Sequence, residues 1–272
     1  MKTILKKLLQ KFGLLVGMNT RDLYDLILHK EYVERIKNSK NPLNQFGAFG
    51  FSQNDEDGII REILRRIGLR DGFFVEYGVG DGLENNTLAL LALGWQGAWF
   101  GGENIKIKLG SDTRLKFEKT WITRDNIGQL FKSLKRQVDL ISLDLDGNDI
   151  FLIEKLLTIG ASPKVFIIEY NAKFPPPIEF RIDYNPDHIW ASDDYYGASL
   201  ASFVSVFEKH NYKLVCCSIS GTNAFFVHNS LEKYFTDVPT DIHELFSEPF
   251  YFLKTRKMHP TSPRTIEKFI KK

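Results

Sequence analysis

Oxygen-bearing side chains two residues apart occur at two places in the sequence, and this spacing could support metal chemistry. Asp144 and Asp146 follow one largely apolar run, and Glu169 and Asn171 follow the next. Residues two apart on a strand share a face, so neighbouring strands would bring these side chains together. Clustered carboxylates raise one another's pKa unless a cation or a proton intervenes. One interpretation is that Asp146, Glu169 and Asn171 bind Mg²⁺ or Mn²⁺, because hard cations prefer oxygen ligands.

Two other interpretations explain the same acids. Asp144 could cap the helix expected at 151–159 or accept hydrogen bonds from backbone amides, with 146–149 forming the preceding turn. Asp144 and Asp146 also form the kind of acid pair by which many glycosyltransferases hold a metal and a nucleotide-sugar. That third interpretation leaves the glycine-rich segment upstream without a role.

Three glycines at alternate positions follow an apolar run that ends in Glu76: Gly78, Gly80 and Gly82. Glycines between a strand and a helix let the backbone approach a ligand closely. A dinucleotide-binding loop requires its third glycine at position 83, which is Leu83. The spacing therefore favours S-adenosylmethionine (SAM) over NAD, with Glu76 or Asp81 as the acceptor for the ammonium group of the cofactor.

Glu103 follows the next apolar run and could accept hydrogen bonds from both ribose hydroxyls of such a cofactor. The complete expected cofactor site consists of Gln53, Glu76, Gly78, Gly80, Asp81, Gly82, Glu103, Thr123 and Asp144.

The elements that must position these residues alternate along the chain. Strands are expected at 72–77, 97–100, 119–123, 138–145 and 164–170, and helices at 58–67, 87–93, 125–136 and 151–159. This alternation predicts a parallel sheet with right-handed crossovers. A helix at 198–210 and a hairpin of two strand-like runs, 212–218 and 224–228, follow. The sum is the seven-stranded, mostly parallel α/β plan of class I methyltransferases, a Rossmann-like fold.

The 272 residues suit one main domain, which we place at 51–235 between a helical N-terminal extension (1–50) and a C-terminal tail (236–272). A net charge of +2 supplies no field that would recruit nucleic acid. The two cysteines are adjacent, which disfavours a structural disulfide and indicates a reducing, cytoplasmic compartment.

The first sixteen residues alternate lysines with apolar residues at helical spacing. Such a helix could contact an anionic membrane surface, but its commoner use is packing on the same chain or on another subunit of a homo-oligomer. No stretch reaches the roughly 20 apolar residues of a membrane span.

Four segments together resemble the FkbM-like methyltransferases: 52–57 (SQNDED), 76–82, 141–147 and 167–169. The resemblance covers about residues 50–230. It implies a SAM-dependent methyltransferase of the kind that accompanies polysaccharide or natural-product sugar pathways. Two departures from the family pattern are Gly101-Gly102 before the ribose acid, in place of an apolar pair, and Asp146 in place of Glu.

Residues after the fifth expected strand would form a substrate wall. Pro175, Pro176 and Pro177 stiffen this segment, and aromatic residues around His188 could stack on a sugar face. His188 is a candidate general base, because an imidazole titrates near pH 6.5. We therefore expect methyl transfer to an oxygen of a small-molecule or glycan acceptor, with His188 and Asp146 as catalytic residues. A binding or assembly protein that kept the fold and lost turnover remains an alternative.

Overall fold

The structure is a computed structural model that describes residues 7, 11, 20–109, 114–250 and 262–270. The chain divides into two units, 1–39 and 40–272. In the first unit, helix α2 (Thr20–Asn38) confirms the helical character expected of the N-terminal extension. The amphipathic helix expected at 1–16 lies outside the described residues, apart from Lys7 and Lys11. The sequence-based boundaries at 50 and 235 stay predictions.

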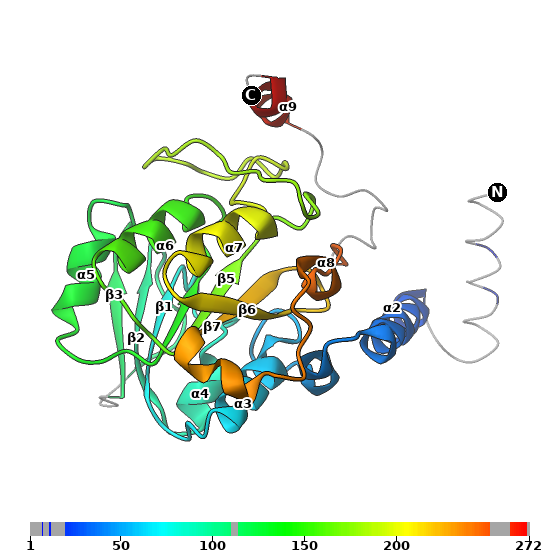
Figure 1. Cartoon of the computed structure of the whole chain (residues 1–272), viewed down its shortest axis with the longest axis horizontal. Helices are drawn as coiled ribbons and strands as arrows, with labels where there is room; N and C mark the ends of the chain where they lie inside the picture. Colours follow the sequence, from blue (N-terminus) through cyan, green and yellow to red (C-terminus); the bar gives the residue numbers. More distant parts are fainter. Residues whose placement is uncertain (1–6, 8–10, 12–19, 110–113, 251–261, 271–272) are drawn as a thin grey trace. The chain divides into compact units, whose positions relative to one another are not determined.

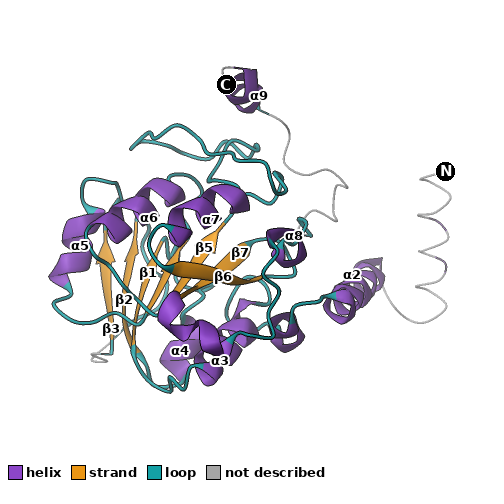
Figure 2. Ribbon diagram, viewed as in Figure 1, coloured by secondary structure: helices purple, strands orange, loops and turns teal. Residues whose placement is uncertain are grey.

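The second unit is built on one seven-stranded sheet (Figures 1 and 2). Its strands are β1 (Phe73–Tyr77), β2 (Gln96–Gly101), β3 (Leu115–Lys119), β4 (Leu140–Leu143), β5 (Val165–Glu169), β6 (Tyr212–Cys217) and β7 (Asn223–His228). Their order is β3-β2-β1-β4-β5-β7-β6. β7 runs antiparallel to both β5 and β6, and the other neighbours are parallel. This is the class I methyltransferase fold, so the expected fold class is confirmed.

Helices cover both faces of this sheet. The described helices of this unit are α3 (Glu56–Arg66), α4 (Leu88–Ala92), α5 (Ile127–Ser133), α6 (Asp149–Thr158), α7 (Leu200–Glu208), α8 (Ile242–Leu245) and α9 (Pro263–Ile270), with short 3₁₀ helices η1 (Pro42–Phe46) and η2 (Asn229–Tyr234). α9 does not cover the sheet and instead contacts Asp183 and Asp194. Figure 2 shows α5, α6 and α7 on one face and α3 and α4 on the other. Because both faces are covered, the central strands are mostly apolar and almost entirely buried, without the alternation of a one-sided sheet. Among the helices that the structure describes, none combines the length and apolar character of a membrane span.

The strand expected at 119–123 is wrong, because β3 ends at Lys119. β3 is an edge strand and keeps half-exposed and exposed residues within it, so its polar positions hid it in the sequence. The apolar residues after it belong instead to the turn that leads into α5.

The carboxyl ends of β1 to β5 meet at one edge of the sheet, where the loops after these strands gather. The strand order reverses between β1 and β4, since β1 leads outward to β2 and β3, whereas β4 leads to β5. Ligands of open α/β sheets bind at such a reversal, outside the carboxyl ends of the strands.

Candidate active site

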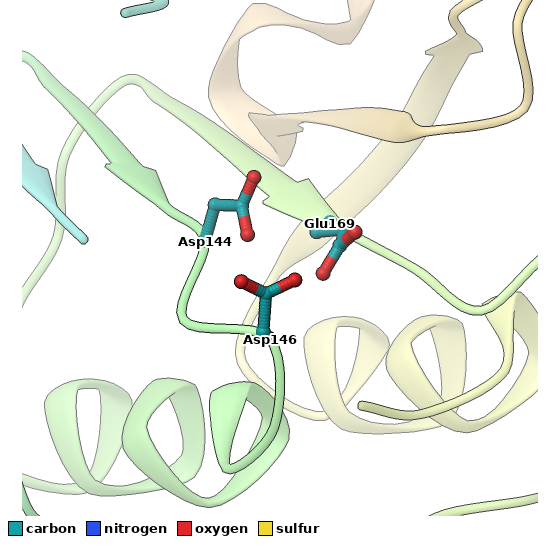
Figure 3. Close-up of side chains that lie close together, drawn as sticks. All are labelled: Asp144, Asp146 and Glu169. Atoms are coloured by element: carbon teal, nitrogen blue, oxygen red, sulfur yellow. The ribbon is translucent and has the colours of Figure 1, made fainter. Parts of the chain in front are cut away.

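Three carboxylates converge at the carboxyl ends of β4 and β5. Asp144 and Asp146 follow β4, Glu169 is the last residue of β5, and one oxygen of each lies within 4.8 Å of the others. Figure 3 shows the three carboxyl groups turned toward one another. Burial raises the pKa of Asp144 and of Glu169 well above the ordinary range, and repulsion between the acids adds to it. These three residues, here called the acid cluster, repel one another when ionised, so a shared proton or a bound cation would stabilise them.

Asp146 has a left-handed backbone conformation, with φ of 52°. This region is unusual for residues other than glycine, although Asp tolerates it better than most. The fully buried Asp149 holds the turn at 145–147. Its carboxylate accepts hydrogen bonds from the backbone N–H of Leu145 (2.8 Å) and Gly147 (2.9 Å). Burial raises the pKa of Asp149 to about 6. Asp149, which the sequence analysis did not single out, therefore fixes the turn that presents Asp146.

Asn171, the remaining expected metal ligand, makes hydrogen bonds within the protein. Its buried side-chain amide donates hydrogen bonds to the carbonyl groups of Asp194 and Tyr196, both at 3.0 Å. Its side-chain oxygen accepts a hydrogen bond from the backbone N–H of Lys173 at 3.2 Å. These bonds hold the segment after β5, and metal coordination by Asn171 stays a prediction.

The glycine loop after β1 lies against the loop after β4. Gly78 has a φ of +94°, and a Cβ at this position would collide with the carbonyl oxygen of Asp144. Gly78 is therefore required for the two loops to approach. Gly80 has a φ of +51°, and no atom of the described residues lies within 4 Å of the place where its Cβ would be. The loop thus borders open space, as a cofactor site requires.

Glu76, one of the two expected acceptors for the ammonium group, is already engaged within the protein. Its buried carboxylate accepts hydrogen bonds from the backbone N–H of Asn86 (2.9 Å) and from the backbone N–H (3.3 Å) and hydroxyl (2.5 Å) of Thr87. These bonds fix the far end of the glycine loop. The other candidate, Asp81, forms an ion pair with Lys106 at 2.8 Å.

The remaining expected cofactor residues have different surroundings. Glu103 is exposed in the turn after β2, and Gln53 is exposed in the turn before α3. Thr123 has a structural role: its N–H donates to the side-chain oxygen of Asn126 at 2.8 Å, and its hydroxyl accepts from the N–H of Asn126 at 3.4 Å. These two bonds close the turn that leads into α5, and the cofactor contact expected of Thr123 stays a prediction.

Residues 183–196, here called the crossing loop, reach from the β5 side of the sheet to the β3 side. The side chain of Asn148, just before α6, donates to the carbonyl of Asn185 at 2.7 Å. The indole N–H of Trp121, beyond β3, donates to the carbonyl of Pro186 at 2.8 Å. The hydroxyl of Tyr184 accepts a hydrogen bond from the N–H of Arg124 at 3.0 Å. The crossing loop, rather than the proline segment, therefore spans the loops after β4 and β3.

His188 lies on the crossing loop, against the loop that carries Asp146. A Cβ at Gly147 would overlap its imidazole ring. Its Nε2 is buried and has no hydrogen-bond partner within the described part of the chain. Burial and the positive charge of Arg264 hold the pKa of His188 below its ordinary value, although Asp193 and the backbone of Asp146 oppose this. His188 is thus held in its neutral form beside the acid cluster.

Two features of this site were missed in the sequence. Trp121 lies over Gly102, 3.2 Å from the place where a Cβ would be, and is 54% exposed next to the turn that holds Glu103. Its signal was an isolated tryptophan after a strand end. Arg264 approaches from the C-terminal segment, and no local pattern in the sequence connects it with His188.

No known protein family and no curated protein matches the sequence. Solved structures with a similar fold include the MycE methyltransferase from the mycinamycin biosynthetic pathway in complex with Mg, SAH and mycinamycin VI (14% identity, TM-score 0.44, 73% of this chain). The chain spans 62% of the length of that protein. Others are the N-terminal domain of EvdMO1 in the presence of SAH and D-fucose (12%, 0.42, 74% of this chain and 96% of that one) and the METTL16 MTase domain (12%, 0.41, 63% and 66%). Because the sequence identities and TM-scores are low, the fold is identified by the strand order and not by these comparisons. The relationship to FkbM-like methyltransferases stays a resemblance.

Proposed function

We propose that this chain is a SAM-dependent O-methyltransferase that acts on a sugar hydroxyl with the help of a divalent cation. The observation that carries the proposal is the acid cluster at the ends of β4 and β5, next to the glycine loop after β1. Because β1 and β4 are neighbouring strands, a cofactor at the glycine loop after β1 would lie next to a cation at the acids after β4.

The glycine loop and Glu103 would hold the cofactor. SAM supplies an electrophilic methyl group when it is bound. The open space over Gly80 admits it, and the exposed Glu103 at the end of β2 is placed to accept hydrogen bonds from ribose hydroxyls. Trp121 offers an exposed ring beside Glu103. Because Glu76 and Asp81 are engaged within the protein, backbone carbonyl groups of the loop are left to accept hydrogen bonds from the ammonium group.

Asp144, Asp146 and Glu169 would hold the cation. Their mutual repulsion, the raised pKa values of Asp144 and Glu169 and the left-handed turn at Asp146 fit a cation site better than three isolated acids. A divalent ion lowers the pKa of a bound hydroxyl group and orients it.

His188 would accept the proton that leaves the acceptor hydroxyl. Its Nε2 has no hydrogen-bond partner among the described residues, and its lowered pKa favours the neutral ring near pH 7. Nε2 would take the proton of the acceptor hydroxyl as the acceptor oxygen replaces the sulfur of the cofactor on the methyl carbon. Partly exposed tryptophan rings, Trp121 and Trp190, offer faces for a sugar ring to stack on.

The cofactor assignment is tested by titration with SAM. We expect Gly80→Val to fill the open space over the loop and Glu103→Ala to remove the ribose acceptor, so both should weaken SAM binding at least tenfold, which is about 1.4 kcal/mol. Gly160→Val is the matched control, because Gly160 also has a positive φ (+86°) and open space but lies at the end of α6. It suffers the same backbone strain and should keep full affinity.

Three results would contradict parts of the proposal. Unchanged SAM affinity in both site variants would remove the cofactor assignment. Binding of a nucleotide-sugar in place of SAM would indicate a glycosyltransferase. SAM binding without transfer of a labelled methyl group in a broad acceptor screen would indicate a binding protein.

A further inference from the structure

The C-terminal segment 262–270 docks on the crossing loop through a buried carboxylate. Asp194 accepts hydrogen bonds at one oxygen from the N–H of Ser262 (2.8 Å) and the hydroxyl of Thr265 (2.7 Å). Its other oxygen pairs with the ammonium group of Lys173 at 2.5 Å. Lys268 pairs with Asp183 at 2.6 Å. These contacts place α9 in a defined position on the loop that carries His188.

Arg264 is the residue that this docking presents. Its guanidinium group lies over the ring of Tyr195, 3.9 Å from the centroid, while the side chain stays exposed. No carboxylate within the described ranges forms an ion pair with it. Together with that of Lys268, its charge lowers the pKa of Asp183, whose two oxygens are already engaged by Lys268 and by the hydroxyl of Tyr195 (3.2 Å).

Arg264 and His188 flank the same tyrosine. The rings of His188 and Tyr195 are 6.5 Å apart, and Arg264 covers Tyr195 at 3.9 Å. The positive charge of Arg264 also reaches the imidazole of His188. The guanidinium group and the imidazole of His188 therefore neighbour the same aromatic ring, within electrostatic reach of each other.

We propose that Arg264 binds an anionic group, a carboxylate or a phosphate, on the acceptor, an inference that rests on the proposed function. A guanidinium group stacked on an aromatic ring is held flat and keeps its N–H edge available for two parallel hydrogen bonds to an anion. The acceptor class is then an acidic sugar, such as a uronic acid, or a phosphorylated sugar. The small net charge of the chain does not oppose this, because the recognition is local.

Binding of three probes tests the inference without requiring turnover. The probes are methyl glucuronoside, glucose 6-phosphate and the neutral methyl glucoside, measured by ligand-detected NMR with S-adenosylhomocysteine and Mg²⁺ present. A charge-assisted hydrogen bond corresponds to roughly tenfold to hundredfold in affinity, so the wild type should prefer an anionic probe by that factor. Arg264→Gln should abolish the preference and leave binding of methyl glucoside within about twofold.

Arg181→Gln is the matched control. Arg181 also lies near an aromatic ring, 5.6 Å from the centroid of Phe151, but it is paired with Glu154 at 2.9 Å. This variant removes the same charge and should keep the preference. A preference for glucuronoside alone would identify a carboxylate, and a preference for glucose 6-phosphate alone would identify a phosphate.

An equal preference in the wild type and Arg264→Gln, or no preference in the wild type, would overturn the inference. The proposed function fails in a different way. If Arg264 governs anion binding but no acceptor receives a methyl group, the inference stands without the methyltransferase. If methyl transfer occurs with no dependence on Arg264, the methyltransferase stands and the inference is wrong.

Discussion

The buried Glu76 of β1 and the half-buried to exposed acid cluster at the ends of β4 and β5 differ in what their oxygens face. Both oxygens of Glu76 accept hydrogen bonds from Asn86 and Thr87, and Thr87 also accepts one from the indole of Trp99. Asp144 and Glu169 instead face each other and Asp146. A carboxylate surrounded by hydrogen-bond donors stabilises the fold. Carboxylates that face one another are stabilised instead by a proton or a bound cation.

This contrast separates a structural role from a functional one. The sequence pattern does not distinguish them, since the acids of both kinds lie at or just after the ends of strands. The contrast predicts that changes at Glu76 act on stability and changes at the acid cluster act on activity. The three experiments below test that separation, from the largest expected effect to the smallest.

The largest effect is expected from removing the cation. EDTA should lower methyl transfer by a factor on the order of 10³, because metal assistance is worth several kcal/mol of transition-state stabilisation. Added Mg²⁺ or Mn²⁺ should restore the activity, and SAM affinity should change little. Glu169→Gln keeps the shape of the side chain and should be equally inactive with or without the ion.

Full activity in EDTA would contradict the metal assignment. If His188→Ala were inactive under those conditions, the reaction would rest on base catalysis alone, and the acids would serve as hydrogen-bond acceptors for the substrate.

The next effect compares the two groups directly by urea unfolding. Glu76→Ala leaves the N–H groups of Asn86 and Thr87 without partners in a buried place, so it should lower the free energy of unfolding by about 3 kcal/mol. Asp146→Gly relieves both the left-handed backbone and the repulsion within the cluster. It should raise the free energy of unfolding by up to about 1 kcal/mol while activity is lost.

The opposite signs are the decisive feature of this pair. A Glu76→Ala protein of wild-type stability with impaired SAM binding would restore Glu76 as a cofactor ligand. A strongly destabilised Asp146→Gly protein would make the acid cluster a structural element.

The smallest effect concerns Asp55, just before α3. It is intermediate between Glu76 and the acid cluster, because only one of its two oxygens accepts a hydrogen bond among the described residues. One oxygen of Asp55 accepts a hydrogen bond from the N–H of Ile219 at 3.0 Å, and the other has no partner among the described residues. Burial, and next the negative charge of Glu56, raises the pKa of Asp55 to about 7. Because this pKa lies above its unfolded value near 4, the contribution of Asp55 to stability is greatest below pH 4 and is lost as the pH rises through 7.

Between pH 6 and 7, this loss should be on the order of 1 kcal/mol in the free energy of unfolding. Asp55→Asn cannot ionise, so its unfolding free energy should fall less over the same interval. Parallel pH profiles for the two proteins would show that Asp55 does not titrate there.

The sequence indicates the fold well because the buried parallel strands are mostly apolar and their spacing is regular. β3 is the exception, since an edge strand with Lys116 and Glu118 lacks that signal while the apolar turn at 121–122 imitates it. The convergence of Asp146 with Glu169 also follows from strand spacing, and the structure brings them together.

The sequence could not reveal which acids were already satisfied. The carboxylate of Glu76 accepts hydrogen bonds from N–H groups ten and eleven residues along the chain. The positions of these groups depend on the turn that separates them from Glu76. Asn171 is committed to carbonyl groups on the crossing loop, and Thr123 to its own helix cap. Such contacts depend on three-dimensional loop geometry, which residue spacing does not encode.

The path of the crossing loop has a thermodynamic consequence. One part of it is tied to Trp121, beside Glu103, and another part carries His188 over Gly147. A cofactor that contacts the first part and an acceptor that contacts the second would both favour one conformation of the crossing loop. Their binding free energies are then linked, and linkage is reciprocal: the factor by which the cofactor tightens acceptor binding equals the factor by which the acceptor tightens cofactor binding.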